Sequence, residues 1–256
     1  MSAPLAAHPS WLVPDWPAPP VVRALVTRRA GGISRGDYAS LNLARHVGDD
    51  AAAVQANREQ LRRLAGLPAE PLWLEQVHGI DVVEHVGQVT VNPPRADAAV
   101  AFEPGRVCAV MTADCLPVVF TDVDGTRIGV AHAGWRGLAG GVLEATVDAL
   151  RVAPGRLLAW LGPAISQAAF EVGPEVRAAF IARNPEHEAA FLQNGAGRFQ
   201  ADLYVLARQV LVRSGVRSIH GGNHCTVAES HDFYSYRRDG GRTGRMATVA
   251  WLADRG

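Results

Sequence analysis

Residues 117–131 read PVVFTDVDGTRIGVA, two apolar runs separated by the dipeptide Asp124-Gly125. Asp-Gly is favoured in two-residue turns in which both central residues need a positive φ. The valine-rich runs on either side favour extended backbone. The stretch therefore predicts an antiparallel hairpin with strands at residues 117–123 and 126–131.

The predicted turn also fixes which residues pair across the hairpin. A two-residue turn at Asp124-Gly125 places His132 opposite Pro117 and one diagonal step from Cys115. Diagonal neighbours on one face of a hairpin are about 7 Å apart at Cα, which a shared metal ion or a direct hydrogen bond can span. Both residues are expected just beyond the strand ends, where side chains can face a cleft.

The segments on either side of the hairpin predict a chain of mixed α and β class. Asp49 and Asp50 precede a helix in which Val54, Leu61 and Leu64 recur at helical intervals, ending near residues 66–68. Strands are predicted at residues 21–27, 72–74, 82–86, 107–111, 118–120, 157–161, 216–219 and 246–252, and helices at 138–152, 175–182 and 203–214. No regular alternation and no linker is visible, so residues 1–256 are predicted to form a single domain, with residues 1–20 as an extended N-terminal arm.

Composition narrows the class of partner. The chain has 256 residues, with 25 Lys and Arg against 25 Asp and Glu, so its net charge is +0 and nothing favours nucleic acid or an anionic membrane. A small-molecule substrate is expected instead. The first residues lack the features of a signal peptide and no apolar run is long enough to span a membrane, so a cytoplasmic location is expected. Three cysteines are too few and too odd a set for a disulfide framework.

His78 is the third candidate for a site with Cys115 and His132. It lies in QVHG, between two predicted strands, from where a loop can reach the same cleft. Two imidazoles and a thiolate suit zinc, and three protein ligands leave one position open, as in catalytic sites. The spacing of the three residues matches no short zinc signature, so cysteine and histidine packed in a core are the alternative.

Two basic segments are candidates for binding an anion. Residues 132–137, HAGWRG, run from a strand towards the predicted helix at 138, where free backbone amides and Arg136 can converge on phosphate. The alternative is a tight turn whose arginine pairs with a surface carboxylate. Residues 235–240, SYRRDG, place Arg237 and Arg238 beside an aromatic ring, although arginines in an exposed loop are more often merely solvated.

Taken together, the motifs resemble those of the YfiH-type family, also called the laccase-domain or DUF152 family. The segments QVHG, TADCLPV, AHAGWRGL, LGPAI and SYRRDG occur in the order of that family, with TR at residues 27–28 and SLNL at 40–43. The resemblance covers nearly the whole chain. It implies an α/β (mixed α+β) fold with a layered architecture, in which helices lie outside two packed mixed sheets.

The resemblance also implies an activity and a set of site residues. Members of the family are described as purine nucleoside phosphorylases that split adenosine, inosine and methylthioadenosine and also deaminate adenosine. Their metal, usually zinc with copper as the alternative, has ligands that fall on His78, Cys115 and His132. Arg28 and Asn42 match polar positions of the family's TR and SLNL motifs and are expected to face the substrate. The family also suggests a monomer or weak homodimer.

Three rival functions remain open from the sequence. Cys115 activated by His132 can act as the nucleophile of an amidase, a role that fits family members implicated in editing peptidoglycan precursors. Copper-dependent oxidation of phenols follows from the laccase label, but one His/Cys/His site does not supply the several coppers that a laccase uses. A metal-stabilised binding module without turnover is the third alternative.

Overall fold

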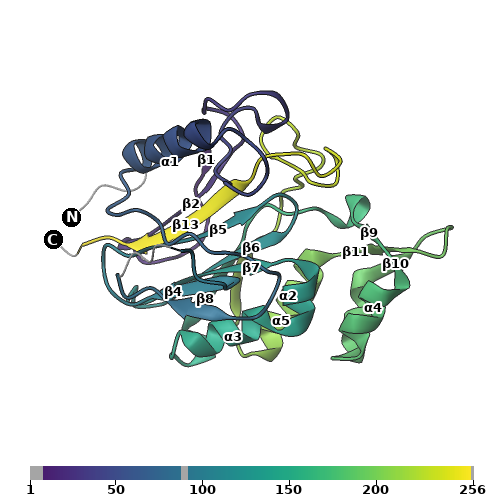
Figure 1. Cartoon of the computed structure of the whole chain (residues 1–256). Helices are drawn as coiled ribbons and strands as arrows, with labels where there is room; N and C mark the ends of the chain where they lie inside the picture. The colour runs from purple at the N-terminus through teal and green to yellow at the C-terminus, as the bar shows by residue number, and fades with distance from the viewer. Residues whose placement is uncertain (1–7, 88–91, 255–256) are drawn as a thin grey trace.

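The structure, a computed structural model, describes residues 8–87 and 92–254. Two larger β-sheets stack face to face, with helices on their outer sides (Figure 1). The predicted mixed class with helices outside two packed sheets is therefore confirmed. A third, small sheet was not predicted.

The first sheet has four strands and is antiparallel, whereas a mixed sheet was expected. Its order is β1 (Trp11–Leu12), β2 (Val22–Thr27), β13 (Met246–Leu252) and β5 (Val107–Thr112). Helix α1 (Ala51–Ala65) lies on its outer face (Figure 1). The Asp50 side chain caps this helix by accepting the Ala53 amide, and Gly66 ends it at φ 61°, so its predicted start and end are confirmed.

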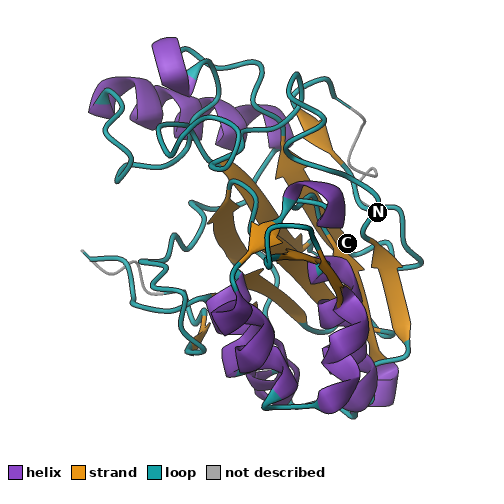
Figure 2. Ribbon diagram, turned by 90° about the vertical axis from the view of Figure 1, so that its right-hand side faces the viewer, coloured by secondary structure: helices purple, strands orange, loops and turns teal. Residues whose placement is uncertain are grey.

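The second sheet has six strands and carries the hairpin. Its order is β12 (Ser218–Gly221), β8 (Leu157–Leu161), β6 (Leu116–Asp122), β7 (Ile128–Ala133), β4 (Ala98–Ala101) and β3 (Val82–Glu84). The β12–β8 and β3–β4 pairs are parallel and the others antiparallel, so the sheet is mixed. Figure 2 shows the strands of the stacked sheets beside the outer helices.

The third sheet has three short strands and lies at one side of the molecule (Figure 1). Its order is β10 (Phe191–Gln193), β11 (Phe199–Ala201) and β9 (Glu171–Val172), and helix α4 (Pro174–Ile181) lies beside it. The short 3₁₀ turns are η1 (Gly36–Tyr38), η2 (Pro154–Arg156), η3 (Gln167–Ala169) and η4 (Pro185–Ala190).

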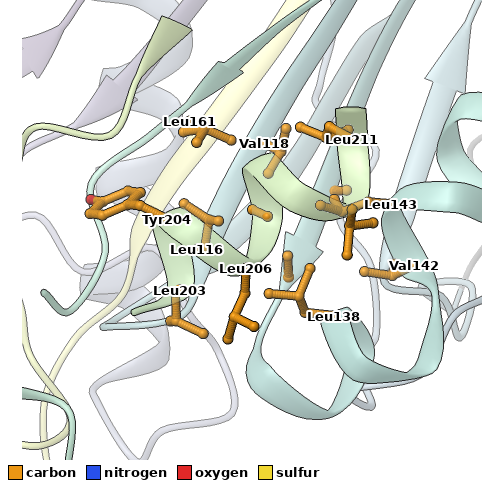
Figure 3. Close-up of a cluster of buried hydrophobic side chains, with 14 of the residues drawn as sticks. Leu116, Val118, Leu138, Val142, Leu143, Leu161, Leu203, Tyr204, Leu206 and Leu211 are labelled. Atoms are coloured by element: carbon orange, nitrogen blue, oxygen red, sulfur yellow. The ribbon is translucent and has the colours of Figure 1, made fainter. Parts of the chain in front are cut away.

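Three apolar clusters hold the layers together. The strands of both large sheets bury residues on each face: Val119 and Val130 point between the sheets, whereas Val118 and Phe120 pack towards the outer helices. Burial on both faces explains why these strands read as continuous valine-rich runs without alternation. Figure 3 shows one such cluster, where Leu116 and Val118 of β6 meet Leu203, Leu206 and Leu211 of helix α5 (Leu203–Arg213).

The hairpin has the predicted register but a different turn. Pro117 pairs with His132, as predicted, yet the last strand pair is Thr121 with Ile128. Only Gly125 of the two turn residues has a positive φ. The side chain of Asp122 explains the wider loop, because its carboxylate accepts the Thr126 and Arg127 amides and the Thr126 hydroxyl. The predicted two-residue turn was therefore wrong, although the pairing that it implied is correct.

The helix predicted at residues 138–152 is also different. Helix α2 (Trp135–Gly140) begins three residues earlier, and α3 (Val142–Ala149) follows after Gly141, whose φ of 112° interrupts the helical path. His132 lies within strand β7 and not beyond its end. The predicted strand at residues 72–74 is reduced to a single bridge between Leu72 and Cys108.

Candidate metal and substrate site

The six-stranded sheet brings His78, Cys115 and His132 together from three separate segments. His78 lies in the loop before β3, Cys115 directly before β6, and His132 in β7. Their ligand atoms all lie within 4.8 Å of one another, and the Cys115 Sγ is 3.9 Å from the His78 Nε2. The two imidazole rings meet edge to face, with centroids 4.7 Å apart. Two imidazole nitrogens and one thiolate at this spacing form a donor set that fits a transition-metal ion.

A single buried carboxylate, Asp97, orients both histidines. Its Oδ1 accepts the His132 Nδ1 hydrogen at 2.8 Å and the His78 amide at 2.9 Å, and its Oδ2 accepts the Gly79 amide at 2.7 Å. The Val77 amide also donates to Oδ2, at 3.1 Å. The bond to Nδ1 leaves the Nε2 of His132 for a metal, while the amide bonds hold His78 at its positive φ of 59°.

Gly134 makes room for the three candidate ligands. A Cβ at this position would lie 2.9 Å from the Cδ2 of His78 and 3.0 Å from the Sγ of Cys115. The first distance is shorter than real Cβ contacts, and the second is tighter than nearly all of them. The glycine of the AHAGWRG motif therefore leaves space for the ligands, in addition to its position as the N-cap of helix α2.

Cys115 and His132 each shift the pKa of the other. Burial raises the pKa of the Cys115 thiol, but the charge of His132 and hydrogen bonds to both histidines outweigh it and lower the pKa to about 6. Burial lowers the pKa of His132, yet the Cys115 thiolate and the bond to Asp97 raise it to about 9. In the metal-free protein each group therefore stabilises the charged form of the other, which favours a thiolate and imidazolium pair.

The three residues open onto a cavity of about 440 Å³, within the size range of small-molecule sites. Ile165, Phe170, Leu203 and Trp135 give it an apolar wall. The remaining lining residues are His46, Gln76, His78, Met111, Thr112, Ala113, Asp114, Cys115, His132, Arg136, Tyr236, Arg237 and Arg245. A lining that combines apolar side chains with several charged groups suits a ligand with a flat ring and an anionic part.

The candidate substrate residues fall into two groups. Arg136 and Arg237 line the cavity: Arg136 is exposed and stacks on Trp135, while the Arg237 guanidinium donates to the Glu171 carbonyl at 3.0 Å. Arg28 and Asn42 lie outside the lining. Arg28 forms an ion pair with Asp232 at 2.8 Å, and Asn42 is fully buried. A direct contact of these two residues with substrate stays a prediction.

Sequence reasoning missed Asp97 and Asp114. Asp114, at φ 90°, directly precedes Cys115. Its carboxylate accepts hydrogen bonds from the Thr226 and Ser235 hydroxyls and the Arg237 amide, and so connects the 226–237 segment to the site. The available signal for Asp97 was an acidic residue directly before the wholly apolar run 98–101. An aspartate at the start of a buried strand is itself expected to be buried, and a buried carboxylate needs several hydrogen-bond donors around it.

Comparisons with known proteins find relatives that cover nearly the whole chain. The model of a family described as multi-copper polyphenol oxidoreductase laccase matches residues 23–253. A purine nucleoside phosphorylase of Pseudomonas aeruginosa is 54% identical over 249 residues, covering 96% of this chain and 99% of that protein. The purine nucleoside phosphorylase YfiH of Escherichia coli K12 is 52% identical, covering 94% of this chain and 98% of that protein.

Solved structures give the same result at the level of the fold. The crystal structure of a Neisseria meningitidis protein of the DUF152 family has a TM-score of 0.91 and 52% identity, covering 96% of this chain and 100% of that one. YlmD from Geobacillus stearothermophilus has a TM-score of 0.85 at 32% identity, covering 91% of this chain and 92% of that one. Within the described residues, none of the helices has the length and apolar composition needed to cross a membrane.

Proposed function

This chain belongs to the laccase-domain family, also known as the YfiH or DUF152 family, and on that premise we propose that it is a purine nucleoside phosphorylase with one zinc ion at His78, Cys115 and His132. The observation that carries the proposal is a metal-type donor set in the lining of a cavity that also contains apolar side chains and arginines. Relatives with the name purine nucleoside phosphorylase cover nearly the whole chain.

Phosphorolysis divides the substrate into parts that the cavity can hold separately. A phosphate oxygen forms a bond to the ribose C1′ while the bond from C1′ to the purine nitrogen breaks, and its electron pair leaves with the base, which takes up a proton. The apolar wall of Ile165, Phe170 and Trp135 suits the purine ring. The cavity arginines, Arg136 among them, suit the negative charge of the phosphate.

A bound zinc ion would supply Lewis-acid polarisation of an oxygen group or of water. His78 and His132, held by Asp97, would present their ring nitrogens to it, and Cys115 its thiolate. Adenosine deamination, proposed as a secondary activity, uses the same polarisation at the purine C6. Adenosine, inosine and methylthioadenosine are the proposed substrates.

The test of this proposal combines metal content with product analysis. Purified protein is expected to contain about one zinc per chain and to release adenine from adenosine only when phosphate is present, with ribose 1-phosphate as the second product. Ammonia release without phosphate would report deamination. A zinc-loaded protein that splits no nucleoside in the presence of phosphate would contradict the proposal.

A second candidate function, an amidase, is favoured by the coupled thiolate and imidazolium of Cys115 and His132. A nucleophilic cysteine in such a pair would retain activity in metal-free protein, and alkylation of Cys115 would abolish it. Metal-free protein that hydrolyses peptidoglycan-type amides would support this candidate, while activity that depends strictly on the metal would exclude it.

Copper oxidation of phenols has less support. Among residues 8–87 and 92–254, only the His78, Cys115 and His132 group brings three or more potential ligand side chains of this kind together. Oxidation by several coppers needs further clusters of ligands. Copper nevertheless remains the alternative metal for the single site.

A further inference from the structure

The three arginines of the cavity differ in what holds them. Arg136 is exposed and stacks on Trp135, and its guanidinium forms no hydrogen bond within the described part of the chain. Arg237 donates from its Nη2 to the Glu171 carbonyl and from its Nη1, at 3.5 Å, to the Ala169 carbonyl, so each of its two terminal nitrogens already has an acceptor. Arg245 differs from both, because it is anchored through a single terminal nitrogen and its Nε and Nη2 are left together without an acceptor in the described residues.

The Arg245 side chain is anchored at one of its nitrogens. Its Nη1 donates to the carbonyls of Thr243 at 2.7 Å and Gly244 at 3.0 Å. In the segments 8–87 and 92–254, its Nε and Nη2 have no acceptor, and no carboxylate forms an ion pair with it. The Nε and Nη2 edge is the pair of parallel donors with which arginine binds two oxygens of a phosphate or carboxylate.

Asn42 fixes the backbone from which Arg245 projects. Its Oδ1 accepts the Arg245 amide at 3.0 Å, and its Nδ2 donates to Asp49 at 2.9 Å. Asn42 is fully buried, and its carbonyl accepts a further bond from Asn57. The SLNL motif, which does not reach the cavity itself, therefore acts on it through Arg245.

The charges around Arg245 favour an anion. Asp114 is the sole carboxylate among the residues that line the cavity in the described structure, and its oxygens already accept three hydrogen bonds. Burial lowers the pKa of Arg245, and the Cys115 thiolate is the largest influence that raises it, so the arginine lies within electrostatic reach of the metal ligands. A half-buried cation without a carboxylate partner is stabilised when an anion enters.

We infer that Arg245, positioned by Asn42, is the residue that binds inorganic phosphate beside the His78, Cys115 and His132 group through its Nε and Nη2. The inference rests on the proposed phosphorylase function and adds to it the phosphate subsite. Arg136 lies in the lining of the same cavity and adds a second positive charge to it.

The test measures phosphate binding directly and catalysis separately. Binding of inorganic phosphate to the zinc-loaded protein is followed by calorimetry without nucleoside, for wild type, Arg245→Gln, Arg245→Lys and the control Arg242→Gln. Arg242 is three residues away, is exposed and lies outside the cavity lining, so its substitution removes the same charge without touching the site. Arg245→Gln is expected to weaken phosphate binding about 10- to 100-fold, the loss typical of charged hydrogen bonds.

Kinetics provide the second readout. Arg245→Gln is expected to raise the KM for phosphate by a similar factor while the KM for adenosine changes little. Arg245→Lys, which keeps the charge but not the fork, is expected to restore binding only in part. Asn42→Ser should raise the phosphate KM and leave the adenosine KM unchanged, whereas a merely structural effect would lower stability and activity towards both substrates together.

The outcomes separate the inference from the function on which it rests. Phosphate-dependent adenine release with an unchanged phosphate KM in Arg245→Gln overturns the inference and leaves the phosphorylase proposal intact. Phosphate binding that depends on Arg245 in a protein that splits no nucleoside supports the inference and overturns the proposal. Tight binding of adenosine 5′-monophosphate, lost in Arg245→Gln, with no binding of inorganic phosphate would assign the subsite to a nucleotide and overturn the inference as stated.

Discussion

Asp97 connects the two histidines of the site through one buried side chain, and its replacement tests how far the ligands depend on it. Asp97→Asn keeps the volume but places an amide N–H among groups that all donate. We expect the zinc affinity to fall about 10- to 100-fold, as for other residues that orient metal ligands. Titration with a competing chelator measures this, with the exposed Asp148→Asn as the control. Equal zinc affinities for the two variants would show that Asp97 does not orient the ligands.

The acidities of Cys115 and His132 predict how metal binding depends on pH. A metal must displace the proton of His132, whose pKa is raised to about 9. Below about pH 6, it must also displace the proton of Cys115, whose pKa is lowered to about 6. The apparent association constant is therefore expected to be flat above pH 9 and to fall about tenfold per unit from pH 9 to 6. Below pH 6 the decline should be steeper. Chelator competition across this range checks the slope, and an affinity independent of pH between 6 and 9 would contradict the assigned protonation states.

Gly134 tests the packing around the same atoms. Gly134→Ala adds a Cβ that meets His78 and Cys115 at about 3 Å, so these ligands must move apart. Because the φ of Gly134 is −61°, alanine can adopt its backbone conformation, and the effect should be confined to the site. We expect a loss of zinc affinity with little change in the free energy of unfolding of the metal-free protein. Gly155→Ala, where the new Cβ meets nothing within 4 Å, is the control.

At the scale of elements, the hairpin shows what sequence can predict and where it stops. The register of β6 and β7 follows from turn position and strand pattern, and this register alone predicts that Cys115 and His132 are neighbours. The prediction of a two-residue turn was wrong because the Asp122 carboxylate accepts the Thr126 and Arg127 amides and so stabilises a longer loop than Asp-Gly favours. Local propensity carries no information about such a contact.

The loop that Asp122 organises gives a prediction for the hairpin as an element. Asp122→Ala leaves the Thr126 and Arg127 amides and the Thr126 hydroxyl without their acceptor in a buried place. We expect the free energy of unfolding, measured by urea denaturation, to fall by about 2–3 kcal/mol. Asp124→Ala, which removes only an exposed ion pair with Arg156, should cost less than about 1 kcal/mol. Similar losses for the two variants would mean that Asp122 does not hold the loop.

Partners that are distant in sequence set the limit of prediction at the site. His78 and the two hairpin residues could be nominated from motifs, but Asp97 and Arg245 could not, since their roles arise where separate segments meet. Asn42 and Arg245 are 203 positions apart. The small sheet of β9, β10 and β11 could not be predicted either, because its strands have only two or three residues, too few for a periodic pattern.

For the molecule as a whole, the proposed zinc ion is a cross-link between segments that the chain brings together only on folding. Its ligands come from the loop before β3, from the connection between β5 and β6, and from β7, so it joins both large sheets through Cys115. The unfolded chain does not present them at metal-binding distance. Metal binding therefore favours the folded state by mass action.

That coupling predicts a stability that depends on zinc. At a free zinc concentration of about 100 times the Kd, binding adds about 2.7 kcal/mol, which corresponds to roughly 5–10 °C in Tm for a chain of this size. Calorimetry of zinc-loaded and chelator-treated protein measures the shift, and His78→Ala is the matched variant because this exposed ligand contributes little to the core. In His78→Ala the difference should shrink to a small fraction of the wild-type value. An equal zinc-dependent shift in both proteins would place the stabilising metal at another site, and the His78, Cys115 and His132 assignment would then fail.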